Sequence, residues 1–373
     1  MIVRLAAYML MLIVGGTLLS GCSSEIERPS LEDMAFIGVI GFDYINEKDV
    51  KVSVSTPVPS RSKEKTQVYS TVATVMSEAM LKMSTKAERT MSLSQLRVIL
   101  FNEEYARKVG IRKVVLDLYR NPSVGENAFV AIVKGNTEDL IRASYQNKPE
   151  LNTYLNDLLR PRVETAFSSF TSIQDSVYMM TNEVSDMNVP YLVKEDDDIQ
   201  ITKVALFKDD KMIGSVSQRE GKLIQALLGR KRLPRMSFEF QDQSGKGSKT
   251  EQVVLDFVWS KSKVRSNGSL DHPMISMKLE FRGMLVGYTG SKDLKSNKQL
   301  TQLKKQLESE IKKETQKLVQ RLQKEGVDPA SLEESLRQKY HGKWTRPFAM
   351  VLYQKAGFNV TINMEVVGYG TIK

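Results

Sequence analysis

Few residues of this chain have the types and spacing that chemistry requires, and the first is Cys22, the only cysteine among 373 residues. It ends a segment in which Arg4 supplies a positive charge and Leu5 to Leu19 gives 15 residues without a charge. Two small residues follow, at the place of a cut site, and this order is that of a bacterial secretory signal. The apolar run is short for a membrane span, which needs about 20 residues. The sequence therefore predicts an exported protein whose signal peptide, residues 1–21, ends beside a thiol.

The four residues Leu19, Ser20, Gly21 and Cys22 resemble the lipobox of bacterial lipoproteins. The resemblance implies that the thiol of Cys22 is the nucleophile that receives a diacylglyceryl group, and that Cys22 becomes the first residue of the mature chain. Because two acyl chains anchor a protein stably where one binds only marginally, we expect a lipid-tethered protein at a membrane surface. Two alternatives remain, a cleaved signal with an accidental cysteine and an uncleaved N-terminal helix.

Beyond Cys22 the residues that could carry catalysis or bind a metal are sparse. His272 and His341 are the only histidines, and without a second cysteine they are too few for a zinc site. The chain has no Gly-x-Ser-x-Gly elbow, no Walker A loop and no dinucleotide fingerprint. Scattered carboxylates could serve a wall hydrolase, but the sequence does not give their separation. We therefore predict no catalytic residues, no metal and no cofactor, and we expect that the protein is not an enzyme.

A cluster of basic residues is the surface feature that stands out. The segment 229–235 places four cations after a predicted helix, namely Arg230, Lys231, Arg232 and Arg235. One interpretation is contact with anionic lipid head groups or with an acidic partner. The other is a solvated helix end, where cations also suit the helix dipole.

The net charge of +10 falls to +9 once residues 1–21 are removed, because that segment holds Arg4 and no acidic residue. A basic exported protein is attracted to anionic lipids or wall polymers, although lysines that only keep the protein soluble are an equal alternative. Export and the absence of a finger spacing or an RNA-binding strand motif argue against nucleic acid as a partner.

The length of the chain suits two or three domains, and 41% hydrophobic residues suit a globular body rather than a polytopic membrane protein. We expect an N-terminal α/β domain over 22–185, a linker over 186–198, a middle α/β domain over 199–260 and a C-terminal α+β domain over 261–373. The linker is inferred from Pro190 and the acidic run 195–198, which lacks the glycine turn and distal Glu of a calcium loop.

Hydrophobic periodicity predicts the elements of the first domain. We expect a cap at Asn136 for the helix that follows it, and a break near Gly110 between two helices. The expected strands are 34–42, 49–56, 68–75, 95–101 and 128–133, and the expected helices are 76–86, 103–120 and 151–178, the last broken near Pro161.

The C-terminal half alternates as strands over 199–207, 212–216, 236–241, 251–259, 274–288 and 359–368, with helices over 220–228 and 332–340. The spacing suggests an antiparallel sheet. The strongest helix signal covers 294–325, where leucines recur at three- and four-residue steps over a length on the order of 40 Å. We expect this amphipathic helix to pack on the sheet of its own domain. A coiled-coil seam and a membrane-surface face are the alternatives, and the mixed charge of the polar side weakens the second.

Several stretches, in order along nearly the whole mature chain, resemble the C subunit of bacterial spore germinant receptors, the Ger(x)C lipoprotein family. They are 19–22 with 36–43, 94–107 with 114–120, 203–214, the long helix with 326–329, and Trp344 with the last strand before Gly368. The resemblance implies an α+β lipoprotein of three mixed α/β domains on the outer face of the spore inner membrane. There it would lie beside two integral-membrane subunits, A and B, in a complex that senses nutrients.

We therefore predict a lipid-anchored subunit of a nutrient germinant receptor that acts through protein–protein contacts. The alternative is a solute-binding lipoprotein that feeds a membrane transporter. That class usually has two doubly wound lobes, which the expected antiparallel sheet disfavours.

Overall fold

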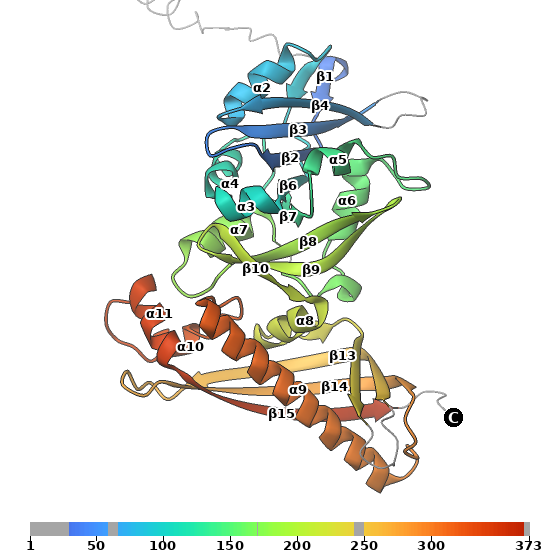
Figure 1. The fold of residues 1–373 in the computed structure, drawn as a ribbon, viewed down its shortest axis with the longest axis vertical. Helices are drawn as coiled ribbons and strands as arrows, with labels where there is room; N and C mark the ends of the chain where they lie inside the picture. The colour runs from blue at the N-terminus through green and yellow to red at the C-terminus, as the bar shows by residue number, and fades with distance from the viewer. Residues whose placement is uncertain (1–29, 59–65, 170, 242–249, 369–373) are drawn as a thin grey trace, which may run out of the picture. The chain divides into compact units, whose positions relative to one another are not determined.

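The computed structural model describes residues 30–58, 66–169, 171–241 and 250–368, which are coloured in Figure 1. The predicted signal peptide and lipobox, up to Cys22, lie outside the described residues. Ahead of Ala35, the described residues hold the 3-10 turn η1 (Leu31–Asp33) and the start of strand β1. From Ala35 onward the described chain combines helices with three sheets, and this confirms the predicted mixed α+β class.

An eight-stranded sheet has the order β10-β9-β8-β7-β6-β2-β3-β4. Its four central strands are parallel, and antiparallel pairs flank them at both edges. The central strands β6 and β7 are almost wholly buried, as expected for parallel strands covered on both faces. The strand bounds are β2 Val39–Tyr44, β3 Val50–Pro57, β4 Thr66–Ala73, β6 Val98–Asn102, β7 Phe129–Val133, β8 Asn188–Glu195, β9 Asp198–Lys208 and β10 Lys211–Ser217.

Six helices of this half cover the two faces of the sheet. Val98 and Leu100 of β6 belong to the same core cluster as α5 and α6, whereas Ile99 and Phe101 belong to the cluster of α2, α3, α4 and α7. A short additional sheet pairs β1 (Met34–Phe36) with β5 (Thr90–Ser92). The helix bounds are α2 Met76–Ser84, α3 Glu103–Lys108, α4 Arg112–Tyr119, α5 Thr137–Arg142, α6 Leu151–Leu159 and α7 Ile173–Thr181, with a 3-10 turn η2 at Val163–Thr165.

The expected break between α3 and α4 is confirmed, because Gly110 has a φ of +89°, a conformation that favours glycine. Asn136 stands at the expected N-cap position of α5, but its side chain makes no capping bond. Asp43 takes that role from β2: its Oδ1 accepts from the Thr137 amide at 2.6 Å and its Oδ2 from the Glu138 amide at 3.1 Å. Burial raises the pKa of the Asp43 carboxyl, although these hydrogen bonds oppose the rise.

The C-terminal half is built on a five-stranded sheet packed by long helix α9. Strands β13 and β14 are antiparallel, as predicted, whereas β15 pairs parallel to β14. The parallel pairing follows because α9 to α11 carry the chain back to the starting end of β14 before β15 begins. The bounds are α8 Gln218–Leu227, β11 Arg232–Leu233, β12 Met236–Gln241, β13 Thr250–Ser266, β14 Met274–Tyr288, α9 Asn297–Glu325, α10 Glu334–Arg337, α11 Arg346–Lys355 and β15 Gly357–Gly368.

Helix α9 buries the predicted leucine stripe, including Leu303, Leu307 and Leu318, in the same core cluster as the inward residues of the sheet. Ion pairs link α9 to α8, from Arg219 to Glu314 at 2.6 Å and from Arg321 to Glu220 at 3.1 Å. These contacts bear out the expectation that α9 packs on the sheet of its own domain.

The linker predicted over 186–198 is wrong for most of its length, because residues 188–195 form β8 between β7 and β9. The acidic run that suggested a linker is the exposed turn between β8 and β9, and the buried residues 188–192 precede it. The eight-stranded sheet therefore crosses the predicted boundary at 198, and β13 crosses the one at 260. The division into three domains stays a prediction.

Candidate interaction surface

The four predicted surface cations have different surroundings, because the chain after α8 is bonded to β13. Arg230 is half-buried and its Nε donates to Gln225 Oε1 at 3.1 Å, and burial lowers the pKa of its guanidinium. Arg235 pairs with Asp256 at 2.7 Å. Lys231 and Arg232 are exposed. Of the four predicted cations, Arg230 is therefore half-buried, Arg235 is exposed but paired, and Lys231 and Arg232 are exposed on or beside β11.

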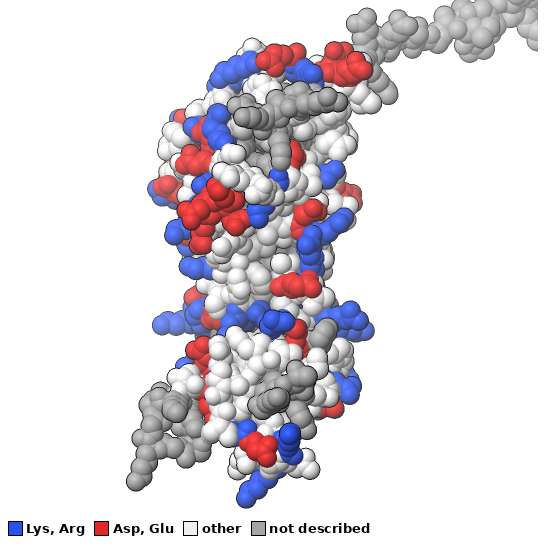
Figure 2. All heavy atoms as spheres, turned by 90° about the vertical axis from the view of Figure 1, so that its right-hand side faces the viewer, with Lys and Arg blue, Asp and Glu red and all other residues white. Residues whose placement is uncertain are grey.

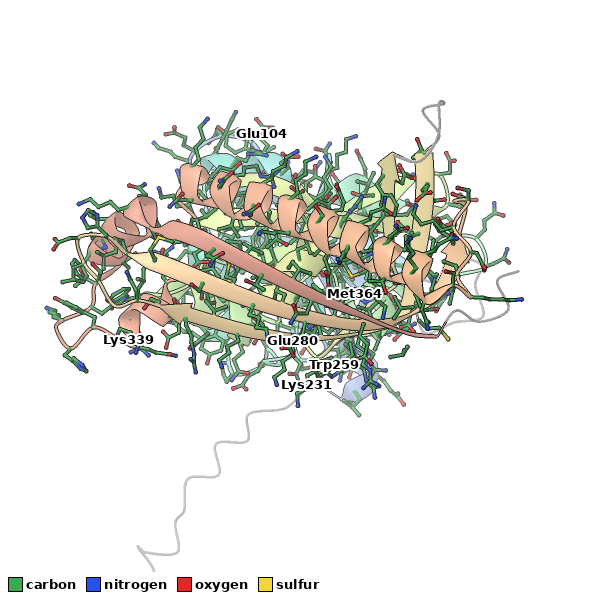
Figure 3. The ribbon with its side chains drawn as sticks, turned by 90° about the horizontal axis from the view of Figure 1, so that it is seen from below. Glu104, Lys231, Trp259, Glu280, Lys339 and Met364 are labelled. Atoms are coloured by element: carbon green, nitrogen blue, oxygen red, sulfur yellow. The ribbon has the colours of Figure 1, made fainter. Side chains whose placement is uncertain are left out.

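The exposed pair continues onto an open face of the C-terminal sheet. Side chains of β13, β14 and β15 alternate between buried and exposed, and no helix in the described part of the chain covers the exposed side. Figure 3 looks onto this side and places Glu280, Trp259 and Lys231 in order across it. Its charged side chains are Lys261, Lys263, Arg265, Lys278, Glu280, Arg282 and Glu365.

Cations outnumber carboxylates on this open face. Lys263 and Lys278 are direct cross-strand partners, and like charges at such positions destabilise a sheet. The Glu280 carboxylate relieves part of this repulsion, because it pairs with Lys278 at 2.8 Å. This pairing and the nearby Lys261 and Lys263 lower the pKa of Glu280. The face can therefore attract anionic groups.

Trp259 is the aromatic residue of the open face, and its side chain is 39% exposed. Its cross-strand partners are Arg232 on β11 and Arg282 on β14. Tryptophan and arginine are the residue types that most often dominate binding energy at protein interfaces. The row Arg232–Trp259–Arg282, which we call the Trp259 row, is therefore a candidate protein-binding surface.

A second notable site is buried, and we call it the carboxylate cluster: Asp186, Asp328 and Glu333 with Arg346. Asp186 precedes β8, Asp328 follows α9, Glu333 precedes α10 and Arg346 begins α11. Arg346 pairs with Asp186, and with Glu333 at 3.5 Å. Asp186 Oδ2 also accepts from the Asp328 amide at 2.7 Å, and Asp328 Oδ2 from the Glu333 amide at 2.7 Å. The cluster thus ties residues next to the eight-stranded sheet to the segment that follows α9.

The guanidinium of Arg346 pairs with two of the three carboxylates, those of Asp186 and Glu333, and Asp328 and Glu333 are fully buried. Burial raises the pKa of both carboxyls. Repulsion from Asp186 raises the pKa of Asp328 further, and repulsion from Asp328 and Asp186 does the same for Glu333. Asp328 Oδ1, Glu333 Oε1 and the hydroxyl of Tyr353 have no hydrogen-bond partner among the described residues. Protonation of one carboxyl near neutral pH would remove part of this unpaired charge.

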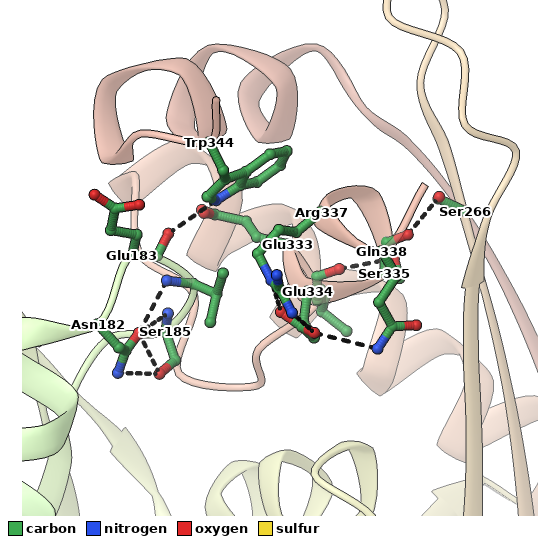
Figure 4. Close-up of polar contacts among 12 residues, drawn as sticks. Asn182, Glu183, Ser185, Ser266, Glu333, Glu334, Ser335, Arg337, Gln338 and Trp344 are labelled. Carbon is green, nitrogen blue, oxygen red and sulfur yellow. Dashed lines mark hydrogen bonds and ion pairs between the residues drawn. The ribbon is translucent and has the colours of Figure 1, made fainter. Parts of the chain in front are cut away.

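Further polar contacts near the carboxylate cluster also join the segment after α9 to other parts of the chain (Figure 4). The Trp344 indole Nε1 donates to the Glu183 carbonyl at 3.2 Å, and Ser266 Oγ donates to the Ser335 carbonyl at 2.6 Å. Trp344 also packs edge-on against Phe348 and Tyr340. These contacts hold the segment that follows α9 against the chain before β8 and against β13.

Comparison with models of known families identifies the family of this chain. The model described as "Spore germination protein N-terminal domain" matches residues 27–194, and "Spore germination B3/ GerAC like, C-terminal" matches residues 202–370. The chain belongs to the Ger(x)C family of spore germination proteins. The two models meet between β8 and β9, inside the eight-stranded sheet.

Individual relatives cover the chain from end to end. Spore germination protein GerQC of Bacillus cereus is 24% identical over 362 residues, 97% of this chain and 98% of the relative. Spore germination protein KC of Bacillus subtilis is 20% identical over 375 residues, 92% of this chain and 89% of the relative. The crystal structure of the GerBC protein matches with a TM-score of 0.57 at 15% identity, over 88% of this chain and 96% of that one, and shows the same fold.

Two stretches that carry the Ger(x)C resemblance lie in or beside the carboxylate cluster. Residues 326–329 contain Asp328, and Trp344 makes the contact with Glu183. Sequence reasoning missed the cluster because its members are up to 160 residues apart along the chain. The one local signal was an acidic residue, Asp328, two residues after the glycine that ends the long helix.

The remaining predicted residues lie away from these sites. The His272 amide donates to Ser269 in an exposed turn, and His341 is exposed beside α10. In the described ranges no group of His, Cys, Asp or Glu has the arrangement of a metal site. The described helices include none that is long and apolar enough to span a membrane.

Proposed function

We propose that this chain is a lipid-anchored, non-catalytic subunit of a nutrient germinant receptor at the spore inner membrane. Cys22 would carry the lipid and hold the protein on the outer face, beside the integral-membrane A and B subunits. The observation that carries the proposal is the match to both family models in order, over residues 27–194 and 202–370. The signal peptide and lipobox read from the sequence supply the anchor.

The surface chemistry supports a role in protein contact. The Trp259 row places an exposed aromatic residue between arginines on the two neighbouring strands, of which Arg282 also pairs with Glu365 at 3.3 Å. Basic side chains also form a band across the face shown in Figure 2, which suits acidic partners or anionic surfaces. A lipid anchor would raise the local concentration of such a surface near its membrane partners.

The experiment is nutrient-triggered germination of spores that carry Cys22→Ala. We expect germination to be slowed or lost, because the unacylated chain leaves the membrane, whereas triggers unrelated to nutrients still work. Ser24→Ala, two residues further on, is the matched control and should leave germination and membrane fractionation unchanged. Normal germination by a Cys22→Ala protein that stays in the membrane fraction would contradict the proposed anchor.

A further inference from the structure

Helix α9 separates its charges in a way that the sequence alone conceals. Six of its lysines point to solvent along one side, which we call the lysine crest: Lys298, Lys305, Lys312, Lys313, Lys317 and Lys324. The opposite side is the buried leucine stripe. The exposed residues between the lysines are polar, such as Thr301, Ser309 and Gln320, and none is apolar.

Three of the four acidic residues of α9 have partners, two of them on other elements, and the fourth, Glu310, is half-buried. Glu314 pairs with Arg219 of α8, Glu308 accepts from the Met364 amide of β15 at 2.9 Å, and Glu325 lies 3.8 Å from Arg321. Within the described ranges, no carboxylate lies within 4.0 Å of a crest lysine. Between Lys298 and Lys324 the charged residues that are fully exposed are therefore all lysines, whereas the glutamates of that stretch are half-buried.

The geometry of the crest limits what can bind it. From Lys298 to Lys324 the line is about 39 Å long at the rise of an α-helix. Lys313 and Lys317 are four residues apart, and like charges at that spacing destabilise a helix unless a counter-charge is near. A packed protein interface needs aromatic or apolar anchors at its centre, and the crest has none.

We propose that the lysine crest binds the anionic head groups of a lipid bilayer as a second membrane contact, separate from the acyl anchor. A flat bilayer presents many exchangeable negative charges along a line of this length, and each lysine near such a surface adds to the attraction. The assignment to a membrane rests on the proposed function, which places the chain at one. The contact is electrostatic and does not insert apolar residues, because the apolar side of α9 is occupied by the sheet.

The test uses residues 22–373 with Cys22→Ser, which keeps every described residue and excludes any acyl chain. Binding is measured by co-sedimentation with phosphatidylcholine vesicles, with and without about one third phosphatidylglycerol. We expect binding to the anionic vesicles only, and its loss at high salt because exposed charges are screened.

The decisive variant changes Lys305, Lys312, Lys313 and Lys317 to Gln, and we expect its affinity for anionic vesicles to fall about tenfold or more. The matched control changes four exposed lysines elsewhere to Gln, namely Lys86, Lys113, Lys134 and Lys194, and should keep its affinity within about twofold. A variant with Arg at the same four positions keeps the charge, and it should bind anionic vesicles as the parent does. Thermal melting checks that each variant is folded.

Equal binding by the crest and control variants would overturn the proposal. So would equal binding to neutral vesicles, or crest-dependent binding to soluble polyphosphate without binding to anionic vesicles, which would point to a polymer instead. Because no acyl chain is present, these failures are independent of the Cys22→Ala germination result.

Discussion

At the residue scale, the carboxylate cluster is the least expected feature of the chain. Its three carboxylates are buried with one guanidinium, that of Arg346, which pairs with Asp186 and Glu333 but not with Asp328. A buried carboxylate is costly unless it is paired or protonated. The folded protein therefore gains by holding a proton that the unfolded chain would release at neutral pH.

This cluster predicts a dependence of stability on pH with a definite sign. The pKa of Glu333 is raised above its ordinary value of 4.5, so the folded state binds the proton more tightly than the unfolded state does. Its contribution to the free energy of unfolding is complete below about pH 4.5 and is lost as pH rises through the raised pKa. We expect the free energy of unfolding to fall from pH 5 to pH 8, by at most about 1.4 kcal/mol per pH unit for one proton.

Urea unfolding at several pH values checks this expectation in the parent and in Glu333→Gln. The variant should show a flatter profile because its amide does not titrate. Glu334→Gln is the matched control, since Arg337 lowers the pKa of its half-buried neighbour Glu334, which is already ionised above pH 5. The same slope in parent and Glu333→Gln would show that Glu333 does not titrate in this range.

At the element scale, the end of α9 sets the position of the cluster. Gly326 follows the helix with a φ of +69°, and its amide donates to the Gln323 carbonyl at 3.1 Å. This left-handed residue turns the chain so that Val327 and Asp328 are buried at once. The sequence predicted the helix and its end because the leucine spacing and the glycine are local signals.

Gly326→Ala should therefore destabilise the protein by about 1 kcal/mol, because a Cβ disfavours the left-handed conformation. Gly125→Ala is the matched control, since its φ is not in that region and a Cβ there would meet nothing within 4 Å. The measurement is the midpoint of urea unfolding at fixed pH. A Gly326→Ala protein as stable as the parent would mean that the turn after α9 relaxes without cost.

At the scale of the whole molecule, local patterns gave the elements and their class, but not how they meet. Strand alternation identified β3, β14 and β15, and the glycine breaks separated α3 from α4. Prolines and acids near Pro190 concealed β8, whose identity depends on its neighbours β7 and β9. Helix α11 was not predicted, although Pro347 in its first turn is a typical start signal.

The candidate sites show the same limit of sequence reasoning. The basic segment 230–235 was visible, but the partners of Arg230 and Arg235, which are Gln225 on α8 and Asp256 on β13, were not. The Trp259 row exists only because β11, β13 and β14 are in register. Composition could not separate the lysines of α9 from its glutamates, because their separation arises from packing against α8 and β15.

The Trp259 row makes the last prediction, which concerns assembly. If the chain works beside the A and B subunits, Trp259→Ala should reduce the amount of those subunits that co-purifies with it from detergent-solubilised spore membranes. Loss of a central tryptophan from an interface typically costs 2 kcal/mol or more, so we expect about a thirtyfold weaker association. The fold should persist, since Trp259 is 39% exposed. Tyr178→Ala, at an aromatic residue that is 66% exposed on α7, is the matched control. Equal recovery with both variants would place the partner contact elsewhere and leave the open sheet face as a solvated surface.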